Sequence, residues 1–185
     1  MPGTGRTGLV VGKRGAAPDR RVKRTLDALL QAFIGLLLER PYRGVTIADI
    51  VDRADVGRST FYDHFRNKDD ILLASMGWMF DILADAVRPD APREPLDDLV
   101  AHFWANRRLG RAVLAPPVEA KLRRALAAAV EKRLAAGAPA DPAASKIHAV
   151  RIAAAQLGLL EAWTRGELSA SPDRICDAIR ASARR

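Results

Sequence analysis

Apolar residues recur at every third or fourth position through most of this chain, a spacing that places them on one face of an α-helix. The longest early run starts after Asp19, a residue type that often caps helices, and stops at Pro41, which cannot continue one. Further Pro and Gly residues divide the remainder. About nine helices follow from this pattern, over residues 19–40, 47–54, 58–65, 68–87, 95–106, 107–114, 118–134, 143–165 and 171–183. No alternation of β-branched residues favours a strand, so the predicted fold class is all-α.

Local signals define the second, third and fourth of these helices more closely. Thr46 followed by Asp49 resembles a capping box with Asp in place of Glu, so a helix should start just after Thr46. Residues 55–57 read Asp-Val-Gly and predict a tight turn that Gly57 permits. Ala54 is small where the helices on either side of this turn must approach closely. Asn67 is expected to cap the fourth helix, which should continue without a break to about residue 87.

The composition is that of a globular protein with an anionic partner. Of the 185 residues, 49% are hydrophobic and 28% are charged, which is enough apolar material for a core. The formal net charge is +8 and the excess lies early in the chain. Residues 1–68 hold 13 Lys or Arg and 7 Asp or Glu, whereas residues 69–185 hold 17 and 15. A polyanion facing the N-terminal end of the molecule would account for this distribution.

Other compositional features limit the alternatives. Cys176 is the one cysteine of the sequence, so we expect neither an intramolecular disulfide nor a thiolate metal cluster, but a small buried side chain. No stretch reaches the roughly 18 apolar residues that span a bilayer. The N-terminus also lacks the apolar core of a signal peptide. We therefore expect a cytoplasmic protein with no membrane contact.

Residues 1–19 are rich in Gly and Pro and include Arg6, Lys13 and Arg14. They cannot bury enough apolar surface to fold alone, so a disordered basic arm is predicted. Two interpretations of this arm remain open. It is either a solvated tail or an extension that adds contacts to DNA phosphates or the minor groove.

Two short helices joined by a turn over residues 46–68 predict a helix-turn-helix, whose second helix enters the major groove of DNA. Near the start of that helix, Arg58, Ser59 and Thr60 can read base edges, because Arg binds guanine bidentately and Thr offers a hydroxyl and a methyl group. The residues expected to bind phosphates are Thr46, Tyr62, His64 and Lys68. A helical hairpin with a solvated charged face is the alternative, but the positive charge at the same end argues against it.

The string from Val56 to Phe65, Val-Gly-Arg-Ser-Thr-Phe-Tyr-Asp-His-Phe, resembles the DNA-binding signature of TetR-family repressors. Thr46-Ile47 before it, and Asn67-Lys68 with the following Asp-Asp-Ile-Leu, also fit this signature. The resemblance covers residues 20–75 in detail, and beyond them only the length and the helical pattern agree. It implies that the residues named above as base and phosphate contacts hold those roles in this chain.

The resemblance also implies the organisation of the whole chain. Residues 20–68 would form the helix-turn-helix domain, and residues 69–185 a helical domain for ligand binding and dimerisation. The protein would bind a palindromic double-stranded operator and respond to a small-molecule effector. It would act as a repressor, as most members of the family do. Two positions depart from the family pattern. Phe61 replaces a more usual Leu in the core, and Asp63 stands where basic or aromatic residues are common, so Asp63 is left out of the predicted phosphate contacts.

A homodimer through the last two long helices, roughly residues 143–184, is a further implication of the resemblance. The sequence supports it independently, because small and apolar residues share one helical face: Ile147, Val150, Arg151, Ala154, Ala155, Gly158, Leu159 and Ala162. Ile175, Ile179 and Ala183 continue an apolar stripe on the final helix. An intramolecular bundle core explains the same periodicity nearly as well. Recognition of two half-sites favours the dimer.

Large aromatic residues in the second half predict the ligand cavity, with Trp78, Phe103, Trp104 and Trp163 as ligand-binding residues. His102, Gln156 and Glu161 are polar groups that would suit such a cavity. Ordinary core packing is the alternative for each of these aromatic residues.

Nothing in the sequence selects an enzyme. His64, His102 and His148 are dispersed, and neither metal-ligand spacing nor a Gly-rich phosphate loop is present. No catalytic residue, metal or cofactor is therefore predicted. Two other classes of protein remain open. One is an architectural DNA-binding protein with the same helix-turn-helix domain but no effector. The other is a catalytic helical bundle whose basic N-terminal domain has no part in its function.

Overall fold

The computed structural model describes residues 16–114, 116–136 and 141–183, and only the backbone of residues 16–19. Within these ranges all regular structure is helical, which confirms the predicted all-α fold. The elements are α1 (Ala16–Glu39), a 3-10 helix η1 (Tyr42–Gly44), α2 (Ile47–Ala54), α3 (Arg58–His64), α4 (Lys68–Ser75), α5 (Gly77–Asp85), α6 (Glu94–Ala105), α7 (Arg107–Val113), α8 (Val118–Ala135), α9 (Pro142–Arg165) and α10 (Pro172–Ala181).

The start of the chain differs from the prediction of a disordered arm over residues 1–19. Residues 16–19 belong to α1, so the first helix begins earlier than Asp19. The remainder of the predicted arm, residues 1–15, lies outside the described residues.

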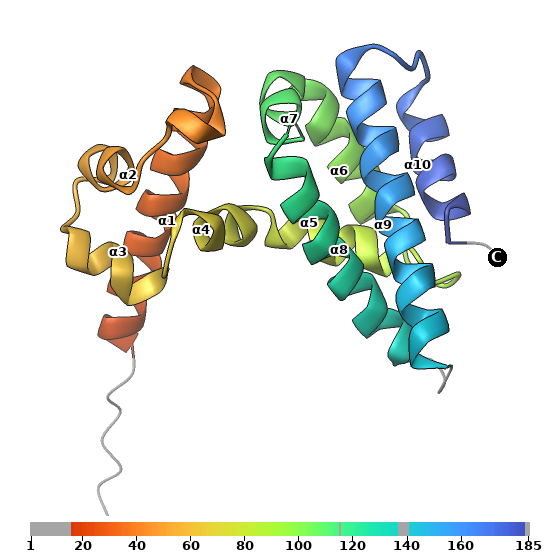
Figure 1. Ribbon diagram of the computed structural model, residues 1–185, viewed down its shortest axis with the longest axis horizontal. Helices are drawn as coiled ribbons and strands as arrows, with labels where there is room; N and C mark the ends of the chain where they lie inside the picture. The colour runs from red at the N-terminus through yellow and green to blue at the C-terminus, as the bar shows by residue number, and fades with distance from the viewer. Residues whose placement is uncertain (1–15, 115, 137–140, 184–185) are drawn as a thin grey trace, which may run out of the picture.

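The helices form two groups that α4 connects (Figure 1). Helices α1 to α3 make a small N-terminal group, and α5 to α10 make a larger bundle. In the N-terminal group the core contains Phe33 of α1, Ile50 of α2, Phe61 of α3 and Ile71 of α4, none of which is exposed. Each helix therefore buries the apolar face that its sequence pattern predicts.

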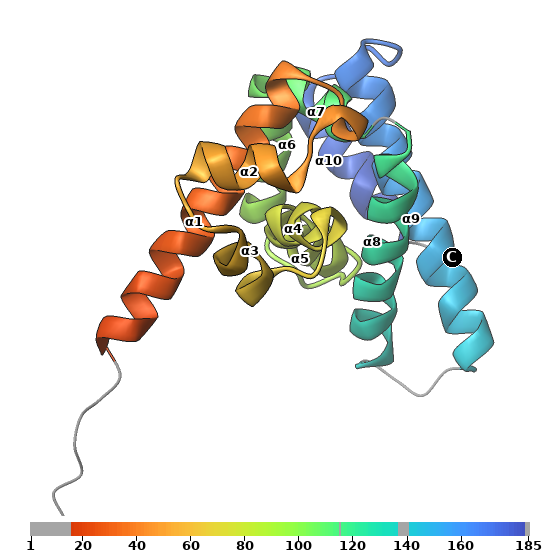
Figure 2. The same ribbon diagram turned by 60° about the vertical axis from the view of Figure 1, so that its left-hand side comes forward.

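The predicted uninterrupted helix over residues 68–87 is wrong, because the chain forms two helices that follow one another in nearly the same direction (Figure 2). The break lies at Met76, whose backbone angles are φ −105° and ψ 0°. Gly77 follows at once as the first residue of α5.

The larger bundle is built on the antiparallel pair α8 and α9, with α5 packed against α8 (Figure 2). Leu122 and Leu126 of α8 and Ile152 and Leu160 of α9 have no exposed surface. Gln156 is buried among them, and its amide nitrogen donates a hydrogen bond to the carbonyl of Leu83 on α5 at 3.2 Å. The bundle core thus contains one polar contact that fixes α5 against α9.

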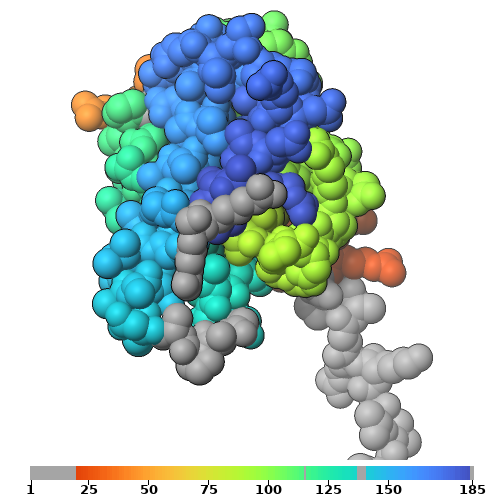
Figure 3. Space-filling view, turned by 90° about the vertical axis from the view of Figure 1, so that its right-hand side faces the viewer, coloured from red at the N-terminus to blue at the C-terminus, as the bar shows by residue number. Residues whose placement is uncertain are grey.

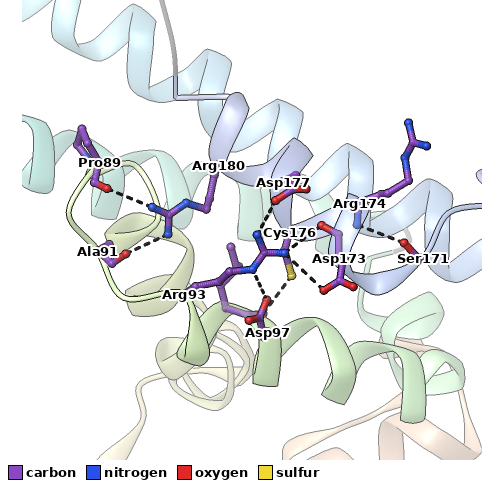
Figure 4. Close-up of polar contacts among 11 residues, drawn as sticks. Pro89, Ala91, Arg93, Asp97, Ser171, Asp173, Arg174, Cys176, Asp177 and Arg180 are labelled. Carbon is purple, nitrogen blue, oxygen red and sulfur yellow. Dashed lines mark hydrogen bonds and ion pairs between the residues drawn. The ribbon is translucent and has the colours of Figure 1, made fainter.

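Helix α10 is attached to the start of α6 by a charged cluster (Figure 4). The guanidinium of Arg93, the residue before α6, donates to Asp97 of α6 at 3.1 Å and to Asp177 of α10 at 2.6 Å. Arg180 of α10 donates to the carbonyl of Ala91 at 3.0 Å. Such half-exposed ion pairs are each weak, but they determine where α10 lies along α6.

The apolar stripe of α10 is part of this protomer's own core. Ile175 and Ile179 are buried, so the intramolecular alternative holds for them and the predicted dimer role does not. Cys176 is buried between them, as expected. Among the described helices, none combines the length and the apolar character that crossing a bilayer requires.

Candidate nucleic-acid interface

Helix α2 begins with the predicted capping box. The Thr46 hydroxyl oxygen accepts a hydrogen bond from the Asp49 backbone N–H at 3.2 Å, and the Asp49 carboxylate accepts one from the Thr46 backbone N–H at 2.7 Å. These bonds from Thr46, together with Arg40 at 3.0 Å, hold the pKa of Asp49 below its usual value. Thr46 is exposed at this helix start, but its hydroxyl already participates in the cap.

The turn between α2 and α3 differs from the prediction in one residue. The left-handed conformation is adopted by Asp55, with φ 53°, whereas Gly57 has φ −69° and needs no glycine-specific backbone. Aspartate tolerates the left-handed region better than most residues, because its short polar side chain can bond locally. The turn therefore depends on Asp55, and the role assigned to Gly57 was wrong.

Helix α3 separates an inner from an outer face. Phe61 and Phe65 point into the domain core, with their ring centroids 5.6 Å apart. Arg58, Ser59 and Tyr62 are exposed, and Tyr62 retains 52% of its surface. Arg58 has no hydrogen bond or ion pair with any described residue, so its guanidinium is available to a ligand.

The other predicted contacts on α3 occupy intermediate positions. Thr60 and His64 are half-buried, and the His64 ring lies 6.3 Å from the Phe65 ring, centroid to centroid. The structure therefore places Arg58, Ser59, Thr60, Tyr62 and His64 on one short helix, with Thr46 at the start of the helix before it. This is the arrangement in which a second helix presents its first turns to a DNA groove.

Lys68 differs from the other predicted phosphate contacts because its ammonium group is already bonded within the protein. It donates to the carbonyl oxygens of Tyr42 at 2.7 Å and of Val45 at 2.6 Å, and it lies 4.1 Å from the centroid of the Tyr42 ring. Partial burial is the main cause of the lowered pKa of Lys68. An ammonium has three N–H donors, so one remains for a phosphate.

A polar cluster that the sequence did not predict joins this domain to the bundle. Asp69, at the start of α4, accepts hydrogen bonds from the Tyr42 hydroxyl and from the Lys121 ammonium of α8. Partial burial alone would raise the pKa of Asp69, but the bonds from Lys121 and Tyr42 lower it below its usual value. We call Tyr42, Lys68, Asp69 and Lys121 the junction cluster. Residues 52 positions apart in sequence meet here, and no local pattern could indicate that.

The residues predicted to bind an effector lie in two places. Trp78 and Phe103 line one small cavity of about 40 Å³ between α5, α6 and α7, together with His102. Trp104 stacks on the buried Trp163, with ring centroids 4.7 Å apart, and this pair does not line that cavity.

The polar groups proposed with these aromatic residues are divided in the same way. His102 lines the cavity, with its ring 5.2 Å from that of Trp78. Gln156 is buried in the bundle core, and Glu161 pairs with Arg165 at 2.8 Å. Among the described residues, no group of three or more His, Cys, Asp or Glu could hold a metal ion.

An exposed, basic helix-turn-helix at one end of a helical bundle is an arrangement typical of DNA-binding transcriptional regulators. Residues 29–75 match the family model described as bacterial regulatory proteins, tetR family. The structure is similar to that of a TetR transcriptional regulator from Streptococcus agalactiae, with a TM-score of 0.58, 25% identity, and coverage of 91% of this chain and 98% of that one. The N-terminal part of the chain therefore carries the DNA-binding module of the TetR family, and the curated proteins that match this part are named as transcriptional regulators.

Sequence relatives match the N-terminal part of the chain. The HTH-type transcriptional regulator YxbF of Bacillus subtilis, itself described as uncharacterized, is 49% identical over 55 residues, which are 29% of this chain and 14% of that protein. The HTH-type transcriptional repressor KstR2 of Mycobacterium tuberculosis is 32% identical over 82 residues, 42% of this chain and 40% of that protein. The chain thus spans less than half the length of these curated relatives.

Proposed function

We propose that this protein is a homodimeric transcriptional repressor that binds a palindromic operator and leaves it when a small molecule binds the bundle. The observation that carries the proposal is the outer face of α3, where Arg58 is exposed and bonded to no described residue. A side chain left free at the start of a second helix is suited to a base edge. Such a regulator would act in the cytoplasm, where bacterial DNA lies.

The predicted DNA contacts fall into two groups, one that recognises bases and one that binds phosphates. Arg58, Ser59 and Thr60 would contact base edges, because they occupy the first turn of α3. Thr46, Tyr62 and His64 would bind phosphates on either side. Lys68 would add one charge-assisted bond through its remaining N–H, while its other two bonds position η1 against α4.

The dimer would form through the outer face of α9. Of its predicted residues, Ile147 keeps 71% and Val150 keeps 48% of its surface in the single chain, which is unusual for aliphatic side chains. Farther along, Ala154, Ala155 and Gly158 are also exposed. Helices α9 and α10 make up much of one broad face of the molecule (Figure 3). Small residues there allow two copies of α9 to approach closely.

The effector would bind at the cavity beside Trp78 and Phe103, because the helices around it reach the DNA-binding group. Helix α7 packs against α1, and α5, which carries Trp78, follows directly on α4 and contacts it. A ligand that displaces α7 or α5 would therefore change the position of α1 or α4. Release requires that the ligand favour the free form over the DNA-bound form, by a coupling free energy of typically about 1–3 kcal/mol.

The test is selection of bound sites from random double-stranded DNA. Dimeric recognition predicts a palindrome whose half-site centres are roughly one helical turn, about 34 Å, or a multiple of it apart. Arg58→Ala should weaken binding by about 1–3 kcal/mol and relax the preference at one position of each half-site. Arg124→Ala is the matched control, since Arg124 is an exposed arginine of α8 that pairs with no described residue.

Three results would contradict the proposal. Recovery of non-palindromic sites would exclude two-fold recognition, and an unchanged preference in Arg58→Ala would exclude α3 as the reading helix. A selected operator that no metabolite extract releases would favour the architectural DNA-binding protein, which has no effector.

A further inference from the structure

A cleft runs between the C-terminal half of α1 and helices α6 and α7. Its volume is about 660 Å³, which is within the range of about 300–1,000 Å³ that small-molecule sites occupy. Ile34 and Leu38 of α1 line one wall, and Arg107, Arg108 and Arg111 of α7 line the other. One side of the cleft therefore belongs to the DNA-binding group and the other to the bundle.

The three arginines of α7 differ from the arginines of this protein that pair with a carboxylate. Those that form ion pairs are Arg40, Arg53, Arg66, Arg88, Arg93, Arg123, Arg133 and Arg165. None of the three on α7 pairs with a carboxylate of the described residues, and no acidic residue lines the cleft. Three neighbouring positive charges without counter-charges create a local field that favours an anion.

Each of these arginines keeps N–H donors free. Arg107 donates one bond to the Trp104 carbonyl at 3.2 Å, and its guanidinium lies 5.4 Å from the centroid of the Trp104 ring. Arg111 donates from its Nε to the Thr164 carbonyl at 2.8 Å. Arg108 makes no contact of this kind with a described residue. A guanidinium has five N–H groups, so the two internal bonds position the side chains and leave most donors for a ligand.

The cleft neighbours the apolar cavity beside Trp78 and Phe103, because His102, Asn106 and Leu109 line both. The cavity alone, at about 40 Å³, holds no more than the end of an aromatic ring, whereas the cleft has room for the rest of a molecule. A ligand that uses both would place its apolar end beside Phe103 and its polar end among the arginines.

We propose that the effector of this protein is a small organic anion, with an apolar body and a carboxylate or phosphate group that Arg108 binds together with Arg107 or Arg111. The role of this anion as an effector rests on the proposed function, whereas the anion-binding site does not depend on it. Arginine forms bidentate bonds with both anions, so they share one recognition chemistry. Because the ligand contacts Ile34 and Leu38 as well as α7, its binding changes the position of α1 relative to the bundle.

The experiment measures thermal unfolding of the full chain without DNA. The probes, at 10 mM, are benzoate, phenylacetate, phenyl phosphate and inorganic phosphate, and benzamide and phenylacetamide are their neutral counterparts. A probe present at ten times its Kd should raise the Tm by about 3–6 °C. The aryl carboxylates and phenyl phosphate separate the two anion types, and inorganic phosphate tests a site that needs no apolar body.

Two variants make the result specific. Arg108→Gln should weaken binding of the anion by about tenfold, because it removes a charge-assisted bond without disturbing an internal contact. Arg124→Gln, an exposed arginine on α8, should leave the shift unchanged. No anion raising the Tm, equal shifts with the amides, or an undiminished shift in Arg108→Gln would overturn the proposal.

A measurement of operator binding separates this proposal from the proposed function. If Arg108→Gln weakens operator binding without any ligand, the arginines bind DNA phosphate and the anion site is refuted. If no palindrome is selected but the anion still raises the Tm through Arg108, the proposed function fails while the anion site stands.

Discussion

Gly158 provides the sharpest test of how two copies of this protein meet. A Cβ built on Gly158 has no heavy atom within 4 Å apart from those of its own helix turn, so the isolated protomer has space for a side chain at this position. Gly158 also lies inside a helix, where glycine is about 0.8–1 kcal/mol less favourable than alanine and leucine is nearly as favourable as alanine. The substitution Gly158→Leu should therefore stabilise the protomer, by roughly 2–4 °C in Tm for a chain of this size.

In the dimer, Gly158→Leu should have the opposite effect and lower the stability. If α9 packs against its copy through Ala154, Ala155 and Gly158, two added leucines must occupy the space where the helices approach. Overpacking of this kind costs about 1–3 kcal/mol, which weakens dimerisation by roughly 5-fold to 150-fold. Dimer formation stabilises the native state by mass action. The variant should thus have a higher Tm than the wild type in dilute solution and a lower Tm in concentrated solution.

Sedimentation velocity over a concentration series gives the dimer Kd, and thermal unfolding at both ends of the series gives the change in sign. Ala128→Leu is the matched control, because Ala128 is exposed on α8 and outside the proposed interface. A dimer Kd for Gly158→Leu equal to that of the wild type would refute the assignment of this face, and equal weakening by Ala128→Leu would show that the effect is not specific to α9.

Three further predictions concern stability and reactivity. Thr46→Ala should lower the free energy of unfolding by about 1 kcal/mol through loss of the α2 cap, and Thr46→Ser should restore it in urea unfolding; equal losses in both would exclude capping as the cause. Burial raises the pKa of Cys176 to about 12, so a maleimide at pH 8 should modify it only in denaturant, and rapid labelling of the native protein would contradict its burial. Because Asp49 and Asp69 have folded pKa values below the ordinary 3.8, their contribution to stability is present above pH 3.8 and is lost as the pH falls through the folded values. Thermal unfolding from pH 6 to pH 3 measures this loss, and a constant Tm across that range would exclude it.

The sequence predicted those features that depend on near neighbours. Pro41 ends α1, and Thr46 and Asp49 cap α2. Asn67 caps α4 by accepting hydrogen bonds from the backbone N–H groups of Asp69 at 2.8 Å and Asp70 at 3.0 Å. Each of these signals acts over three or four residues, so a linear pattern contains all of it. Phe61 and Phe65 face inward for the same reason, since positions four apart share one face of a helix.

What the sequence did not predict depends on which helices pack together. Lys68 looked like a free basic residue, but η1 brings two carbonyl groups to its ammonium. Trp78 and Trp104 looked alike as aromatic residues, yet they lie at different places in the bundle. The arginines of α7 gave one local signal that could have been used: Arg107, Arg108 and Arg111 have no acidic residue three or four positions away. Their cleft, however, requires α1 to lie opposite them.

The junction cluster also sets a condition for building chimaeric regulators from this protein. A head consisting of residues 16–75 carries Tyr42, Lys68 and Asp69, but the cation that completes the cluster, Lys121, belongs to α8. Grafted onto a foreign bundle, the head would bring Asp69 to a junction that lacks the Lys121 ammonium, so that only Lys68 of the head itself would remain as a nearby positive charge. Operator binding would survive such a graft, whereas communication with the new bundle would require a lysine or arginine placed opposite Asp69.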